Sequence, residues 1–158
     1  MKKFTLLFII FFLFSSNFSF ANSKIDFNTQ IDKVINLSND LDTLLDRYTT
    51  FLNNYPNYDG YEEPSEIEYL NRQLSVYQSH VLSDLSELRD LYSVTVDLKD
   101  KAKIARLYSV LTQYLITLIH LRLFYTEEDK ASMLFLANEY KSSADRKLQL
   151  LINNNTNS

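Results

Sequence analysis

The distribution of helix-breaking residues constrains the fold of this sequence more than any other feature. The 158-residue chain contains one Gly and two Pro, and all three lie in one short segment, at Pro56, Gly60 and Pro64. From Ser65 to Ser158 the chain contains neither residue. A β protein would need turn residues about every 8–12 positions along such a stretch. The sequence therefore predicts an all-α fold.

Apolar residues recur at helical spacing in four stretches, which predicts helices over residues 26–53, 65–94, 98–125 and 127–152. In the first stretch, steps of three and four alternate, and this heptad spacing places the residues on one helix face. They are Val34, Leu37, Leu41, Leu44, Tyr48 and Phe51. The second stretch follows an eleven-residue repeat, which leaves a helix nearly straight. Helices of this length are each about 40 Å long, and they favour an up-down-up-down four-helix bundle formed by residues 22–152.

Local signals predict where these helices begin and end. We expect the second helix to give way to the third at residues 94–97, where two Val lower helix propensity and Asp97 can cap the helix that follows. Thr126 is the expected N-cap of the fourth helix, because three acidic residues follow it. Residues 153–158 are polar and are expected to form a disordered tail.

The first 21 residues have the layout of a secretory signal peptide. Two Lys precede an apolar run over residues 4–14, and Ser19 and Ala21 are the small residues required before a cut after Ala21. The run is shorter than the roughly 20 residues of a membrane-spanning helix, so we expect cleavage rather than an uncleaved anchor. The sequence predicts a periplasmic or secreted protein with no stable membrane anchor after cleavage.

Composition argues against several classes of function. The chain has no Cys, which leaves no disulfide, thiolate metal site or Cys nucleophile. A single Gly leaves no Gly-rich phosphate loop, and the net charge of −4 disfavours nucleic acid as a partner. Neither His80 nor His120 has the Glu three positions earlier that a di-metal bundle site needs, and His120 is expected on an outer face. We predict no metal, no cofactor and no enzymatic activity.

The connection between the first two predicted helices, residues 53–64, is the most unusual segment. Tyr recurs there at every third position among acidic residues. Tyr is common in binding hot spots, and neighbouring acids steer a basic partner. We predict a partner-binding set of six residues: Tyr55, Tyr58, Asp59, Tyr61, Glu62 and Glu63. In the alternative interpretation, these rings fold back and close the open end of the bundle.

These features predict an exported helical-bundle protein that acts by binding another protein, one with a basic surface. The roles that fit are an inhibitor or immunity protein, and an adaptor or chaperone in envelope assembly. The strongly apolar helix over 98–125 adds surface for a partner, although a homodimer would also cover it. The alternative from another class is a carrier of haem or a hydrophobic small ligand, with a cavity lined by Tyr114, Leu118 and Leu121.

Overall fold

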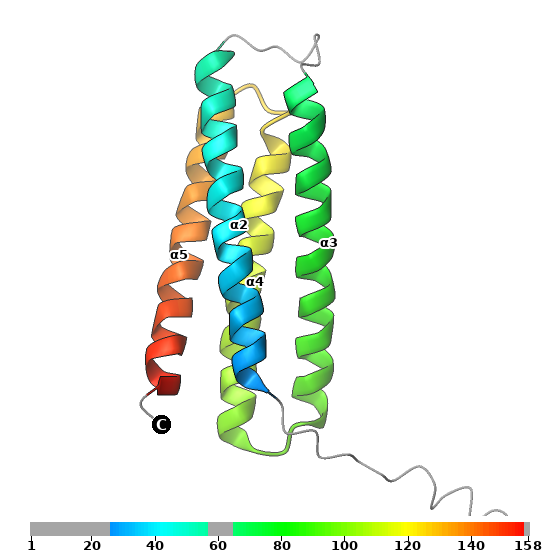
Figure 1. Cartoon of the computed structure of the whole chain (residues 1–158), viewed down its shortest axis with the longest axis vertical. Coiled ribbons are helices and arrows are strands. Elements are labelled where there is room, and N and C mark those ends of the chain that lie inside the picture. Colours follow the sequence, from blue (N-terminus) through cyan, green and yellow to red (C-terminus); the bar gives the residue numbers. More distant parts are fainter. Residues whose placement is uncertain (1–25, 57–64, 157–158) are drawn as a thin grey trace, which may run out of the picture.

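The computed structural model describes residues 26–56 and 65–156, which form four α-helices. They are α2 (Phe27–Asn54), α3 (Ser65–Val94), α4 (Leu98–Leu123) and α5 (Lys130–Thr156). Successive helices lie side by side and run in opposite directions (Figure 1). The described ranges contain no strand, and the predicted all-α, up-down-up-down four-helix bundle is confirmed. The predicted signal peptide, residues 1–21, lies outside these ranges.

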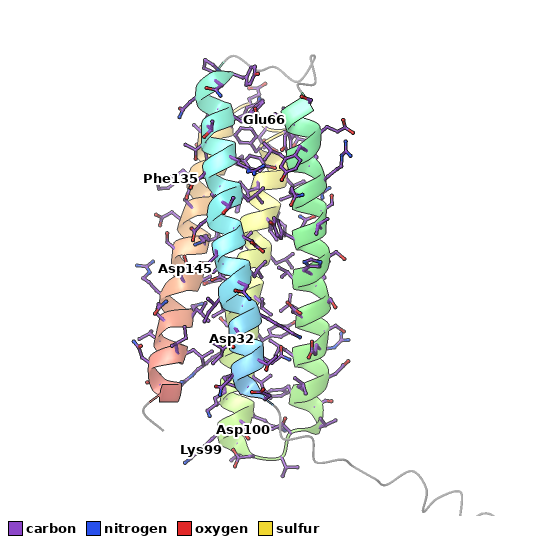
Figure 2. The ribbon with its side chains drawn as sticks, viewed as in Figure 1. Asp32, Glu66, Lys99, Asp100, Phe135 and Asp145 are labelled. Atoms are coloured by element: carbon purple, nitrogen blue, oxygen red, sulfur yellow. The ribbon has the colours of Figure 1, made fainter. Side chains whose placement is uncertain are left out.

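One apolar core fills the space between the four helices (Figure 2). The predicted heptad positions of α2, from Val34 to Phe51, are all buried. The eleven-residue pattern of α3 is buried at Leu74, Val81, Leu85 and Leu88. Burial of a large apolar side chain stabilises a fold by about 1.5–3 kcal/mol, so these two patterns fix which face of each helix points inward.

α4 is the most extensively packed helix, because it lies against both α3 and α5 along long interfaces. α2 packs mainly against α5 and meets α3 along a smaller interface. Of the helices in the described ranges, only α4 has the length and mean hydropathy to cross a membrane. The core helix of a soluble bundle has the same character, and the inner face of α4 is fully buried here, from Leu107 to Leu121.

The turn between α3 and α4 falls where the sequence predicts it. α3 ends at Val94 and α4 begins at Leu98. The carboxylate of Asp97 accepts hydrogen bonds from the backbone N–H of Lys99 at 2.8 Å and of Asp100 at 2.9 Å. These bonds satisfy two of the N–H groups that the first turn of a helix leaves without partners. The two long helices are therefore joined by a tight turn that needs no Gly.

The predicted start of the fourth helix is wrong by three residues. α5 begins at Lys130, because the side chain of Asp129, rather than that of Thr126, accepts the hydrogen bond from a backbone N–H of its first turn. The Asp129 carboxylate accepts from the backbone N–H of Ser132 at 2.9 Å and from the Ser132 hydroxyl at 2.6 Å. The Thr126 hydroxyl instead donates to the carbonyl of Leu123 at 3.3 Å. Thr126 thus completes the end of α4, which is two residues shorter than predicted.

The prediction of a disordered tail from Asn153 onward is also wrong. α5 continues to Thr156, and only residues 157–158 lie outside the described part. Ile152 packs partly buried against the core, next to the buried Leu151. These apolar contacts anchor the last turns of the helix, so the polar residues that follow extend it.

Candidate functional site

The predicted six-residue binding set belongs to the segment between α2 and α3 in the sequence. Of that set, only Tyr55 falls within the described residues; Tyr58, Asp59, Tyr61, Glu62 and Glu63 lie outside them. The Tyr55 ring stacks on the ring of Phe51, with centroids 4.9 Å apart. Phe51 is fully buried, whereas Tyr55 remains 42% exposed. Tyr55 therefore covers the end of the core on one face and offers its other face to solvent.

Phe51, which stacks on Tyr55, belongs to an aromatic cluster in the core with Tyr48, Phe124 and Tyr125. The Tyr48 ring packs edge-on against Phe124 at 5.2 Å. The Tyr125 hydroxyl donates to the Tyr48 hydroxyl at 2.6 Å. Burial, and then the nearby Tyr125, raise the pKa of Tyr48 well above its ordinary value of 10.0. Tyr48 is thus a neutral core residue, and the cluster fills the core at this end of the bundle.

The opposite end of the bundle carries an uncovered apolar surface, which we call the α3–α4 tip. It consists of Val94, Val96 and Leu98. Val96 is 91% exposed and Leu98 is 80% exposed, the two highest values among the large hydrophobic side chains described. From the sequence, the two Val were predicted only to lower helix propensity at the turn. The signal for this surface was in the sequence, because three of the five residues from Val94 to Leu98 are apolar although they lie at a turn.

A hollow of about 270 Å³ lies between α3 and α4, and we call it the α3–α4 groove. Its lining is mainly apolar and aromatic, and consists of Leu88, Arg89, Tyr92, Ile104, Ala105 and Tyr108. Tyr92 is 46% exposed and Tyr108 is 41% exposed. The ammonium of Lys101 lies 5.1 Å from the centroid of the Tyr92 ring. The tip and the groove together bring five apolar or aromatic side chains to one exposed region.

The charges around this region are mostly positive. Asp100 is the only acidic residue of α4. Arg89 is exposed and pairs with the exposed Asp90 at 3.7 Å, a surface contact that contributes little. The cationic residues in the first three turns of α4 are Lys99, Lys101, Lys103 and Arg106, and the acidic Asp97 caps the helix before them. A partner with acidic groups complements this end of the bundle.

A buried polar network joins α2, α4 and α5. Lys141 is 5% exposed, and its ammonium pairs with Asp145 at 2.8 Å and with Asp42. Asp145 also accepts from the hydroxyls of Ser38 at 2.7 Å and Tyr114 at 2.6 Å. Burial would raise the pKa of Asp145, but the hydrogen bonds from Lys141, Tyr114 and Ser38 outweigh it and hold that pKa below 3.8. Because its donors and acceptors are matched, the network fixes how the three helices are rotated.

His120 does not lie on an outer face as expected. It is partly buried between α4 and α5, and its ring stacks on Tyr140 with centroids 5.2 Å apart. Its Nδ1 atom is buried with no hydrogen-bond partner among the described residues. The described residues hold no group of three or more His, Asp or Glu that could bind a metal ion. His120 is therefore a packing residue between the two most tightly joined helices.

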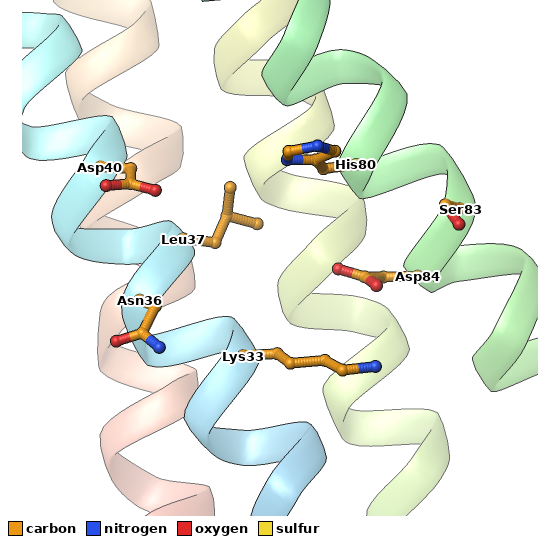
Figure 3. Close-up of a pocket in the computed structure, with 7 residues that line it drawn as sticks. All are labelled: Lys33, Asn36, Leu37, Asp40, His80, Ser83 and Asp84. Atoms are coloured by element: carbon orange, nitrogen blue, oxygen red, sulfur yellow. The ribbon is translucent and has the colours of Figure 1, made fainter.

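A second hollow, of about 330 Å³, opens between α2 and α3, and we call it the α2–α3 pocket (Figure 3). It is lined by Lys33, Asn36, Leu37, Asp40, His80, Ser83 and Asp84. Apart from Lys33, its polar side chains make no hydrogen bond or ion pair within the described part of the chain. Burial raises the pKa of Asp84 above its ordinary value of 3.8, and the charge of Lys33 opposes this rise. The pocket could not be predicted from the sequence, because its residues come from the edges of two helices and apolar spacing does not identify which edges meet.

No protein-family model matches the chain, and no match was found among curated proteins or solved structures. The fold and the surfaces described above define the class of this protein as a four-helix bundle with one apolar end and one polar interhelical pocket.

Proposed function

We propose that this chain is an exported helical-bundle protein that acts by binding another protein. The observation that carries the proposal is the exposed apolar region formed by the α3–α4 tip and groove. Monomeric soluble proteins rarely leave large contiguous apolar surface uncovered, and such surface commonly marks an interaction site. The exposed Tyr92 and Tyr108 add the residue type that most often anchors interfaces.

The N-terminal sequence supports the proposed location. Its basic start, apolar run and small residues before Ala21 have the order of a cleavable signal peptide. A periplasmic or secreted bundle that binds protein fits the role of an inhibitor or immunity protein, or of an adaptor or chaperone in envelope assembly.

The two ends of the bundle suggest different partner chemistry. The six-residue set at the α2–α3 connection contains three acidic residues and suits a basic surface. The tip and groove are apolar with a cationic edge and suit a partner that presents apolar side chains beside acidic ones. The exposure of Val96 and Leu98 supports the tip and groove, whereas five residues of the six-residue set lie outside the described part of the chain.

The alternative of a haem or hydrophobic-ligand carrier has less support. Tyr114, Leu118 and Leu121, the residues expected to line its cavity, are fully buried in the core. The Tyr114 hydroxyl is committed to Asp145. The two hollows described above are lined by other residues.

The test is an affinity capture from the envelope fraction of the source organism, followed by rebinding with both proteins purified. The bait is the chain from Asn22 onward. One variant combines Val96→Asp and Leu98→Asp, and its matched control is Leu150→Asp, which alters a Leu that is 63% exposed on α5. We expect one protein to bind the unchanged chain and the control, and its Kd for the double variant to rise about tenfold or more.

A further bait carries Tyr55→Ala, Tyr58→Ala and Tyr61→Ala together. If only this variant loses the partner, protein binding stands but belongs to the α2–α3 connection. If all variants hold the same proteins as the unchanged chain, neither surface binds them and the assignment of binding to the tip and groove fails. All baits must show the same helical circular dichroism and melting temperature.

A further inference from the structure

An exposed surface runs along the line where α3 and α4 pack together, and two contacts between the helices mark its ends. At one end, Tyr92 of α3 and Tyr108 of α4 line the α3–α4 groove. At the other end, the Arg122 guanidinium of α4 donates to the side chain of Gln78 at 2.7 Å and to that of Ser75 at 3.2 Å, both on α3. Residues between these contacts at alternating steps of three and four lie on the same side of each helix.

These residues form two neighbouring rows, which we call the α3–α4 side face. The row of α3 runs from Ser75 to Tyr92, and the row of α4 runs from Ala105 to Arg122. Each row is about 25 Å long at 1.5 Å per residue, and the two helices lie side by side in opposite directions (Figure 1). The large apolar and aromatic side chains of the two rows are Leu82, Leu85, Tyr92, Tyr108, Leu115 and Ile119.

Several of these apolar side chains are open to solvent. Leu82 is 55% exposed and Ile119 is 44% exposed, which is similar to the exposure of the two Tyr. The other helices of the described ranges lie elsewhere, because α5 does not pack against α3 and α2 meets α3 along residues outside the rows, such as Asp84. The side face is therefore a long apolar stripe that the bundle does not cover.

The charges along the side face are cationic. Arg89 and Arg122 belong to the rows, and the Lys101 ammonium lies against the ring of Tyr92. Neither row contains Asp or Glu, and Asp90, which pairs with Arg89, is exposed. A second copy of this chain would bring like charges together across a two-fold axis. Charge therefore favours a different chain, one that carries acidic side chains.

The shape of the side face favours a helix as the occupant. A helix packs at about 8–10 Å from a neighbouring helix, with its side chains between theirs. Apolar residues at helical spacing on such an occupant would meet exposed side chains that recur here at the same spacing. The α3–α4 groove, with the buried Leu88 and Ile104 in its lining, can receive one projecting side chain. A flat lipid surface does not present such a group.

From these observations we propose that the α3–α4 side face binds an amphipathic helix of the partner protein, with an apolar stripe flanked by Asp or Glu. The inference rests on the proposed function, and it extends the binding surface from the tip and groove along the whole side of the bundle. The apolar stripe of the partner helix covers Leu82, Tyr108 and Ile119. Its acidic residues face Arg89 and Arg122.

Fluorescence anisotropy with a synthetic peptide tests the proposal without knowledge of the partner. The probe is a labelled helical peptide of about 18 residues, with Leu on one face and Glu beside it, titrated with the chain from Asn22 onward at fixed ionic strength. We expect saturable binding, weakened about tenfold or more when Leu82→Asp and Ile119→Asp are combined. The matched control combines Phe135→Asp and Leu150→Asp, which are 64% and 63% exposed on α5. It should bind like the unchanged chain.

Two further comparisons test the charge and the location. A peptide with Lys in place of Glu should bind about tenfold more weakly or worse. Arg89→Glu should weaken binding of the Glu peptide, whereas Arg146→Glu, an exposed change on α5, should weaken it less. The combined Val96→Asp and Leu98→Asp variant should bind the peptide like the unchanged chain. Circular dichroism and melting temperatures of all variants separate lost binding from lost folding.

Several outcomes would overturn the proposal. They are the absence of saturable binding up to about 1 mM chain, equal affinity for the Glu and Lys peptides, and equal weakening by the α5 control. A dimer that the Leu82 and Ile119 variant converts to a monomer in sedimentation would assign the face to a second copy. Anionic phospholipid vesicles that bind the unchanged chain but not this variant would assign it to lipid.

Failure of this inference is distinguishable from failure of the proposed function. A captured partner that binds the side-face variant as tightly as the unchanged chain leaves protein binding intact and refutes the helix site. Peptide binding that follows the expected pattern, with no partner captured by any bait, supports the helix site and counts against the proposed function.

Discussion

Asp145 accepts three side-chain hydrogen bonds inside the bundle, from Ser38, Tyr114 and Lys141. Its replacement by Ala would remove the carboxylate to which the Tyr114 hydroxyl donates and would leave Lys141 with one carboxylate fewer. We expect Asp145→Ala to lower the free energy of unfolding by about 2–4 kcal/mol, measured by urea denaturation. Asp46→Ala, on the exposed face of α2, should change it by less than about 0.5 kcal/mol. A loss below about 1 kcal/mol for Asp145→Ala would show that the network does not stabilise the bundle.

The same residue gives the bundle a defined response to acid. A carboxyl whose pKa is lowered by folding contributes stability that is present above its unfolded pKa and lost as the pH falls through its folded pKa. Asp145 is such a group, with an ordinary value of 3.8. We expect the melting temperature to fall below about pH 4, and to fall less steeply in Asp145→Asn. Parallel slopes for the two proteins would contradict this assignment.

Asp84 contributes to the pH response with the opposite sign. Burial raises its pKa in the folded chain, so the folded chain binds a proton there more readily than the unfolded chain does. Its contribution to stability therefore rises as the pH falls through the raised pKa. Comparison of Asp84→Asn with the unchanged chain separates this effect from that of Asp145.

At the scale of secondary-structure elements, the start of α4 depends on one side chain. The turn before it contains no Gly or Pro, and the Asp97 carboxylate accepts two backbone hydrogen bonds there. We expect Asp97→Ala to cost about 0.5–2 kcal/mol in the free energy of unfolding, measured in urea. Asp97→Asn keeps a capping oxygen and should cost a few tenths of a kcal/mol at most. Equal losses in the two variants would mean that capping is not the role of this residue.

The sequence predicted the helices well, because their signals are local. The apolar spacing of α2 and the Asp97 cap depend only on residues within a turn or two of each other. Thr126 was misplaced as a cap for a related reason, since Thr and Asp are both good caps and Asp129 stands three residues further on. The choice between them depends on Ser132, whose backbone N–H and hydroxyl bind Asp129.

The sites could not be predicted in the same way. The network brings together Ser38, Tyr114 and Asp145, and the α2–α3 pocket brings together Asp40 and Asp84. Each set depends on the rotation and register of helices far apart in the sequence. Hydrophobic spacing gives the inward face of a helix but not the identity of the neighbour at its edges. Both sites are formed by residues at the edges of these inward faces.

At the scale of the whole molecule, the packing is uneven across the bundle. α4 lies between α3 and α5 with long interfaces on both sides, whereas α2 meets its neighbours less extensively. The α2–α3 pocket lies along the weaker side. Elements with fewer packing contacts open at lower free energy than the rest of a fold, so α2 is the helix expected to leave the bundle first.

Hydrogen exchange of single amides measures this order directly. We expect amides in the middle of α2 to exchange at least about tenfold faster than those in the middle of α4, a difference of about 1.4 kcal/mol in opening free energy. The faster exchange should also depend less on added urea, because detaching one helix exposes less surface than unfolding the whole bundle. If amides in both helices show the same opening free energy and the same urea dependence, the bundle opens as one unit.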